Sequence, residues 1–128
     1  MKTKNLHFFE AALATPFMSS EEAWLWYCLC EQLGFHRNRG THERIQRPCE
    51  SSDIFLAVQR LRDRGVLGAQ HLTVLSRYGQ AQSPPHPSFG APPRACGLWH
   101  EAMHFLDTIL KPKGIVIPTL FILFKVLL

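Results

Sequence analysis

The sequence has few of the features that identify an enzyme or a membrane protein on their own. It contains no glycine-rich phosphate loop, no serine nucleophile elbow and no pair of catalytic carboxylates. It also lacks internal repeats and coiled-coil heptads, which argues against a solenoid or a long coiled coil. The apolar stretch at residues 115–128 would reach about 21 Å as a helix, whereas the hydrocarbon core of a bilayer is roughly 30 Å thick. We therefore expect no transmembrane helix.

Cysteine is also scarce, and its irregular spacing argues against a secreted disulfide scaffold. Residues 1–4 are basic, but His7 and Glu10 interrupt the apolar stretch that a signal peptide would need. We expect every thiol to be reduced and most to be buried, and we expect the protein to be cytoplasmic. The four cysteines are Cys28, Cys30, Cys49 and Cys96.

The remaining composition is that of one small globular domain. Apolar residues make up 46% of the chain and charged residues 19%, a balance that supports a packed core. A length of 128 residues is near the commonest size of a single domain. We divide the chain into an N-terminal arm (residues 1–18), a helical domain (19–116) and an apolar tail (117–128). The predicted fold is mostly α, with about four helices.

Capping and stop signals place these helices. Ser19 is followed three residues later by Glu22, a capping box that starts the first helix, and Gly34 ends it. Apolar residues then recur at helical spacing in two shorter segments, and Gly79 is interpreted as the C-terminal signal of the second. Repeated prolines predict a loop at residues 80–94. The later helices are expected at residues 52–63, 69–78 and 95–110.

The apolar C-terminal segment has three alternative interpretations. Residues 115–128 are interrupted only by Pro118, Thr119 and Lys125. They are consistent with a strand-like segment packed on the core, with a partner-binding tail, or with a peripheral membrane anchor. The first interpretation is preferred, and the other two stay open.

Positive charge is concentrated in the middle of the sequence. The chain carries a formal net charge of +4, and eight of its nine arginines lie between residues 37 and 77. Such a cluster can bind polyanions, because a guanidinium group can contact a phosphate through two hydrogen bonds. A solvated basic surface is the alternative interpretation. The clustered residues are Arg37, Arg39, Arg44, Arg47, Arg60, Arg62, Arg64 and Arg77.

The two predicted helices at residues 52–63 and 69–78, joined by a short glycine-bearing turn, are similar in length to a helix-turn-helix. In that motif the second helix enters the major groove of DNA while basic side chains contact phosphates. Such pairs also occur in helical bundles, so a purely structural hairpin is the alternative. The residues predicted to contact phosphates are Arg60, Arg62 and Arg64, and those predicted near the bases are Gln70, His71, Thr73, Ser76 and Arg77.

Residues 100–104 read His-Glu-Ala-Met-His, the HExxH pattern of zinc-dependent peptidases. On a helix, His100 and His104 share one face and would ligate Zn²⁺, while Glu101 would activate the bound water as general base. The uncharged flanks resemble those of the zincin metallopeptidases over about ten residues. This resemblance implies a zinc-dependent hydrolase as an alternative function.

The third protein ligand that a catalytic zinc needs is missing downstream. Asp107 is the only carboxylate after Glu101, and it lies about 10.5 Å along the helix axis from His100. A helical wheel also places both histidines on the polar face, opposite an apolar stripe that includes Trp99. A third ligand would have to come from upstream, where spacing favours none of His36, His42, Glu43, Cys49 and His71.

Several short motifs follow one another along the chain: Glu21-Glu22-Ala23-Trp24, Arg47-Pro48-Cys49-Glu50 with Asp53-Ile54, His71-Leu72, Val74-Leu75, Tyr78-Gly79, Leu98-Trp99, Glu101-Ala102 and Lys113-Gly114-Ile115-Val116. In order and spacing they resemble a small family of alphaproteobacterial proteins of similar size with no established activity. The resemblance covers about residues 19–116 and implies a helical domain without a transferable activity. In that family's pattern, an acidic and an aliphatic residue stand at the positions of His100 and His104, so both histidines depart from it.

Together these patterns predict a small basic protein that acts by binding or regulation rather than by catalysis. Two partners are left open: DNA, through the helix-turn-helix-like pair, or another protein. This interpretation requires no cofactor. The alternative metallopeptidase-like function requires Zn²⁺ at His100 and His104, with Glu101 as the catalytic residue.

Overall fold

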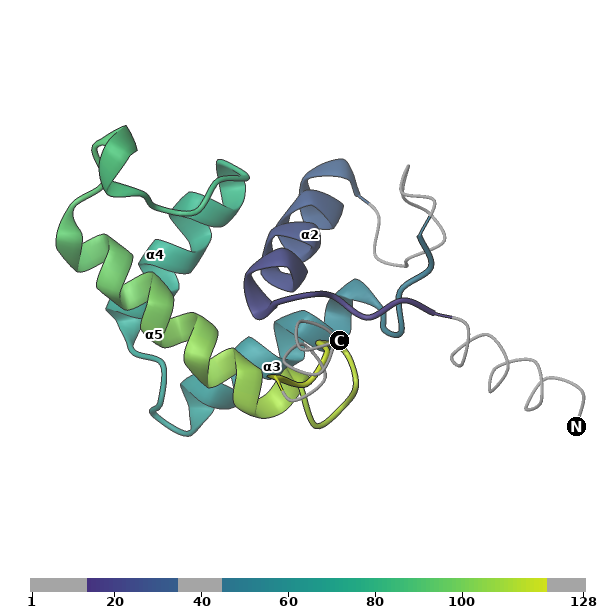
Figure 1. Cartoon of the computed structure of the whole chain (residues 1–128). Coiled ribbons are helices and arrows are strands. Elements are labelled where there is room, and N and C mark those ends of the chain that lie inside the picture. Colours follow the sequence, from purple (N-terminus) through teal and green to yellow (C-terminus); the bar gives the residue numbers. More distant parts are fainter. Residues whose placement is uncertain (1–13, 35–44, 120–128) are drawn as a thin grey trace, which may run out of the picture.

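The computed structural model describes residues 14–34 and 45–119, which form four α-helices and one short 3₁₀ helix (Figure 1). The protein is mostly α-helical, as the sequence predicts. Among the described residues there is no β-strand, only an isolated bridge between Phe17 and Val116. The predicted proline-rich loop connects the last two α-helices and contains the 3₁₀ helix. The elements are α2 (Ser20–Leu33), α3 (Ser51–Asp63), α4 (Ala69–Gln80), η2 (Pro87–Phe89) and α5 (Pro93–Leu110).

Local signals fix both ends of α2 where the sequence predicts them. The Ser19 hydroxyl accepts a hydrogen bond from the Glu22 N–H at 3.1 Å, which satisfies a donor that has no partner inside the helix. The Glu22 carboxylate in turn accepts a hydrogen bond from the Met18 N–H at 3.0 Å. Gly34 ends the helix in the left-handed region, with φ at 77°, and its N–H reaches carbonyl groups of the last turn. The predicted start and stop of this helix are therefore confirmed.

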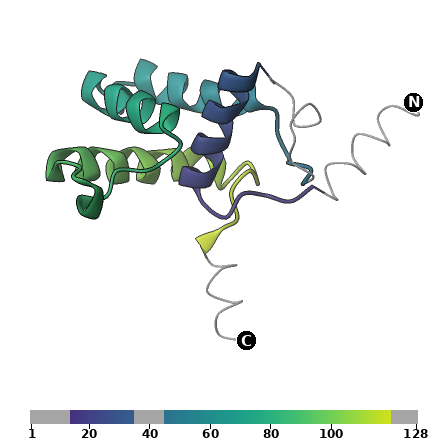
Figure 2. The same ribbon diagram turned by 90° about the horizontal axis from the view of Figure 1, so that it is seen from above.

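The four α-helices pack around one core, and α2 and α5 each contact both α3 and α4. Seen from above, α5 lies on one side, α3 and α4 lie on the other, and α2 runs across them (Figure 2). α3 and α4 contact each other little and are held mainly through the other two helices. Large and fully buried side chains in this core belong to Phe17, Ile54, Leu67, Leu75, Trp99, Leu106, Leu110 and Val116.

Two polar contacts tie α5 to the start of α2. The Trp99 indole N–H donates a hydrogen bond to the Glu21 carboxylate at 2.7 Å, and the Ser20 hydroxyl donates one to the Asp107 carboxylate. Trp99 and Ser20 are each 1% exposed, so these bonds satisfy polar groups that water cannot reach. They hold the start of α2 against α5.

Gly79 lies inside α4, which continues to Gln80, so the prediction that this glycine ends the helix at Tyr78 is wrong. The residue is buried against α2. A Cβ atom at this position would lie 2.4 Å from Cys28 Sγ and 2.9 Å from Trp24 Nε1. Glycine is therefore required here for the close approach of two helices rather than for a turn.

The packed domain extends beyond the predicted boundaries at residues 19 and 116. Phe17 is completely buried, and the guanidinium carbon of Arg47 lies 4.1 Å from its ring centroid. The Phe17 N–H donates to the Ile115 carbonyl at 2.8 Å, and the Ile117 N–H donates to the Phe17 carbonyl at 3.0 Å. The end of the predicted arm and the start of the predicted tail therefore belong to the core.

The structure also tests the predictions made for the cysteines and for membrane-spanning segments. All four cysteines are reduced thiols, three of them buried and Cys96 half-buried, as expected. No helix in residues 14–34 or 45–119 is long and apolar enough to cross a membrane. Residues 1–13, 35–44 and 120–128 lie outside the described residues, so the three interpretations of the tail stay open.

Candidate functional site

α4 presents a polar face that gathers side chains predicted to lie near DNA bases. Gln70, Thr73 and Arg77 are all exposed, and Ser76 is exposed beside Thr73. With 3.6 residues per turn, the first three positions lie within about 60° of one another around the helix. Of the buried residues of α4, Leu75 and Gly79 lie on the opposite side of the helix, whereas Val74 borders this face next to Gln70. The structure therefore brings three predicted base-contacting residues onto one solvent-exposed face.

The side chains on the α4 face make only a few contacts with the rest of the domain. Arg94, from α5, donates a hydrogen bond to the side-chain carbonyl of Gln70. The Thr73 hydroxyl donates to a carbonyl one turn earlier at 2.9 Å. The guanidinium carbon of Arg77 lies 5.9 Å from the ring centroid of Tyr78, and Arg77 forms no ion pair within the described residues. The donors of Arg77 are thus available to a ligand, and Arg94 adds a second cation beside Gln70.

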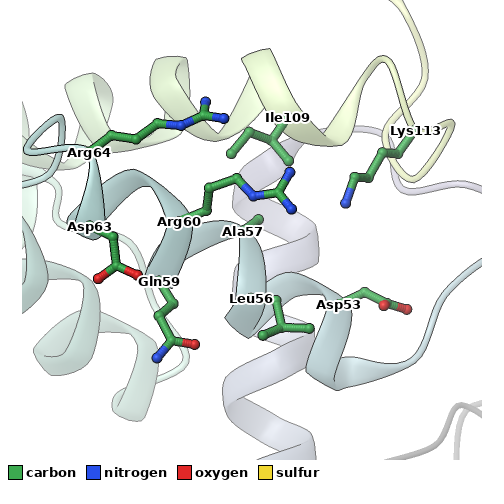
Figure 3. A pocket seen from close by; sticks show the side chains of 9 residues that line it. All are labelled: Asp53, Leu56, Ala57, Gln59, Arg60, Asp63, Arg64, Ile109 and Lys113. Atoms are coloured by element: carbon green, nitrogen blue, oxygen red, sulfur yellow. The ribbon is translucent and has the colours of Figure 1, made fainter.

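The three arginines predicted to contact phosphates do not share one surface. Positions two residues apart on a helix point about 200° apart, and these arginines alternate along the end of α3. Arg60 and Arg64 line a hollow between α3 and the end of α5, together with Lys113 (Figure 3). Arg62 does not line this hollow, but it contacts the carboxylate of Asp63, which does, at 3.4 Å. The structure therefore brings together two of the three predicted residues.

The HExxH string lies on α5, and the side chains of His100, Glu101 and His104 are exposed. The Glu101 carboxylate lies 2.8 Å from Nε2 of His71, which belongs to α4. His71 Nδ1 accepts a hydrogen bond from the Gly68 N–H at 3.1 Å. Because Nδ1 is an acceptor, a neutral ring carries its proton on Nε2 and donates it to Glu101. The predicted general base is thus engaged in a contact between two helices.

The described residues do not complete a zinc site around the two exposed histidines. Among residues 14–34 and 45–119, no group of three or more histidine, cysteine, aspartate or glutamate side chains could hold a metal ion. Burial raises the pKa of the Cys49 thiol to about 12, which disfavours the thiolate that zinc binds. His71 is occupied by Glu101. The other upstream candidates, His36, His42 and Glu43, lie outside the described residues.

Sequence reasoning missed two cations and one contact at these surfaces. Arg94 meets Gln70 from 24 residues away, and Lys113 joins the hollow from beyond the end of α5. The contact between His71 and Glu101 depends on how α4 and α5 are aligned. None of these follows from local spacing. In contrast, the helical period alone predicts that Arg62 points away from Arg60 and Arg64 on α3.

No protein-family model, no curated protein and no solved structure matches this chain. The resemblance of residues 19–116 to an alphaproteobacterial family therefore stays a prediction. The basis for a functional proposal is the geometry of the described residues: the polar face of α4, the hollow beside α3 and the exposed pair of histidines on α5.

Proposed function

We propose that this is a non-enzymatic nucleic-acid-binding protein in which the exposed face of α4 enters the major groove of duplex DNA. The observation that carries the proposal is the grouping of Gln70, Thr73 and Arg77 on one exposed helix face. α4 follows α3 after a turn at residues 64–68, in which Gly65 has a φ of 76°. A helix, a glycine-bearing turn and a second, exposed helix follow the order of a helix-turn-helix.

The chemistry of the α4 face suits the edges of base pairs. The guanidinium group of Arg77 can donate two hydrogen bonds to O6 and N7 of guanine, and the Gln70 amide can pair with N6 and N7 of adenine. The methyl group of Thr73 suits contact with the methyl group of thymine. α4 has 12 residues and is therefore about 18 Å long, and the major groove admits a helix of this kind. When Gln70 turns to a base, Arg94 is released to contact a phosphate.

Charge supports the same partner. The chain has a formal net charge of +4, and Arg77 and Arg94 place two cations on or beside the α4 face. Each phosphate that such a cation neutralises releases counterions from the DNA, so binding weakens as salt concentration rises. The slope of log affinity against log salt is about −0.9 for each phosphate contacted on duplex DNA.

The test is selection from a randomised duplex pool, followed by fluorescence anisotropy with the selected duplex at several salt concentrations. The full chain should enrich a sequence motif, and Gln70→Ala should relax the preference at one base pair. Arg77→Gln should weaken binding to the selected duplex by about 5- to 150-fold, because a bidentate contact to a base contributes about 1–3 kcal/mol of discrimination.

The matched control for Arg77→Gln is Lys113→Gln, which removes the same charge from a position beyond α5. It should leave the selected motif unchanged and reduce affinity much less than Arg77→Gln. An equal loss in the two variants would show nonspecific attraction and would contradict the role assigned to α4. A lack of duplex binding at about 50 mM salt, where electrostatic binding is strong, would contradict the whole proposal.

A further inference from the structure

The hollow beside α3 has the size and the lining of a small-molecule site. Its volume is about 430 Å³, and it lies between α3 and the end of α5. Leu56 and Ile109 contribute apolar lining. The guanidinium groups of Arg60 and Arg64 and the ammonium group of Lys113 lie around Ile109 (Figure 3). Sites for small ligands commonly have volumes of about 300–1,000 Å³ with a few polar groups on an apolar surface.

These three cations form no ion pair within the described part of the chain. The two carboxylates that line the same hollow are engaged elsewhere: Asp53 accepts the Glu50 N–H at 2.8 Å, and Asp63 contacts Arg62 at 3.4 Å. Both carboxylates oppose an incoming anion, but the cations outnumber them. Like charges gathered around a concave surface repel one another, so an anion bound among them would relieve that repulsion.

The end of α3 explains only part of this arrangement. The C-terminus of a helix carries partial negative charge, which favours cations such as Arg60 in the last turn and Arg64 at the C-cap. Lys113 follows α5 and comes from a different part of the chain. The dipole of α3 therefore gives no reason for the lysine to join the two arginines.

We propose that this hollow binds the phosphate group of a small phosphorylated molecule. The guanidinium groups of Arg60 and Arg64 form paired hydrogen bonds with phosphate oxygens, and Lys113 adds a compact charge. The apolar lining supports the remainder of the molecule. A DNA duplex presents its phosphates on a convex surface, whereas these cations surround a concavity. A compact ligand therefore fits the hollow better than the nucleic acid assigned to α4.

The test is titration of the full chain with pyrophosphate. Calorimetry measures the affinity, and amide NMR signals show which residues are affected. Pyrophosphate should bind and should shift signals at the end of α3 and around Lys113. The double variant Arg60→Gln, Lys113→Gln should bind it at least about tenfold more weakly, because two charged hydrogen-bond donors are lost. Arg64→Gln provides a second, independent variant with the same expected direction.

Arg62→Gln is the matched control, because it removes one charge from the same helix at a position that does not line the hollow. The contact of Arg62 with Asp63, which does line the hollow, joins two side chains that are each more than half exposed, so loss of this contact should have little effect. The affinity of this variant for pyrophosphate should change by less than about twofold, since solvent and salt screen exposed charges outside the site. A loss as large as that of Arg64→Gln would show nonspecific attraction and overturn the proposal. A lack of pyrophosphate binding would overturn it as well.

A third measurement separates this proposal from the proposed function. The selected DNA duplex is added to the complex with pyrophosphate. Displacement of pyrophosphate would assign the hollow to nucleic acid and overturn the small-molecule ligand. Simultaneous binding of both ligands supports two separate sites, and failure of pyrophosphate binding leaves the DNA result on α4 unaffected. Far-UV circular dichroism of each variant checks that the fold is retained.

Discussion

Replacing Gly79 with alanine tests the close approach of α4 to α2. An added methyl carbon would lie 2.4 Å from Sγ of Cys28 and 2.9 Å from Nε1 of Trp24, whereas ordinary contacts of this kind are 3.4–4 Å. Both neighbours belong to α2 and are buried, so neither can move into solvent. The substitution must therefore push α2 and α4 apart or distort one of these side chains.

The expected loss of stability is the sum of one stabilising effect and two destabilising effects. Alanine is favoured over glycine inside a helix by about 0.8–1.0 kcal/mol. Overpacking of a core costs about 1–3 kcal/mol. Movement of Trp24 also strains its 2.9 Å hydrogen bond to the Leu75 carbonyl, which contributes about 1 kcal/mol. We expect Gly79→Ala to lower the free energy of unfolding by roughly 1–3 kcal/mol.

Gly97→Ala is the matched control, because Gly97 lies in α5, is exposed, and has nothing within 4 Å of an added Cβ. Only the helix propensity applies there, so this variant should be more stable by about 0.5–1 kcal/mol. The two glycine-to-alanine changes are therefore expected to have opposite signs. Urea unfolding followed by far-UV circular dichroism measures both.

A second variant tests whether Sγ of Cys28 causes the loss of stability in Gly79→Ala. Cys28→Ala removes Sγ and leaves Cβ of that residue 3.5 Å from the new methyl group, an ordinary contact. In the Gly79→Ala background, Cys28→Ala should therefore cost less than it does alone. If Gly79→Ala stabilises the protein as Gly97→Ala does, or if the two substitutions at positions 28 and 79 are simply additive, the packing argument is refuted.

Other predictions concern thiols, a buried indole and a helix cap. Burial raises the pKa of the Cys28 and Cys49 thiols to about 12, so at about pH 8 a thiol reagent should modify only Cys96 in the folded protein; rapid modification of more thiols would contradict this burial. The pKa values of these two thiols are higher in the folded state than in the unfolded state, so their contribution to stability is present below about pH 9 and is lost towards pH 12. Urea unfolding should show this decline, and a free energy of unfolding that stays constant over this range would refute it. Trp99→Phe should lower the free energy of unfolding by at least about 2 kcal/mol, because a buried hydrogen bond to a carboxylate and part of the core are lost; an unchanged urea midpoint would be inconsistent with this. Ser19→Ala should cost about 1 kcal/mol in the same assay through loss of the α2 cap, and a neutral effect would argue against it.

Much of the fold was predictable because its signals are local. Ser19 and Gly34 mark the ends of α2 through the geometry of a single turn, and the spacing of apolar residues in α5 identifies which side faces the core. His100 and His104 lie on the exposed side for the same reason. Such features depend on residues a few positions apart, which the sequence displays directly.

Features that depend on distant residues were not predictable. A glycine near the end of an apolar pattern gives the same signal whether it stops a helix or admits a neighbouring one, and only the position of α2 decides for Gly79. The candidate site shows the same limit. The contact of Glu101 with His71 depends on the alignment of two helices, and Lys113 reaches the hollow because α5 ends beside α3.

The bridge between Phe17 and Val116 affects how the domain responds to a pulling force. The two segments run parallel, so tension that draws residues before 17 and after 117 in opposite directions acts along the bridge. Its two backbone hydrogen bonds, from Phe17 to Ile115 and from Ile117 to Phe17, would then carry the load together in shear. The helices would not bear the applied force until both hydrogen bonds break. Under such a pull, the bridge would therefore hold together the two ends of the described helical domain.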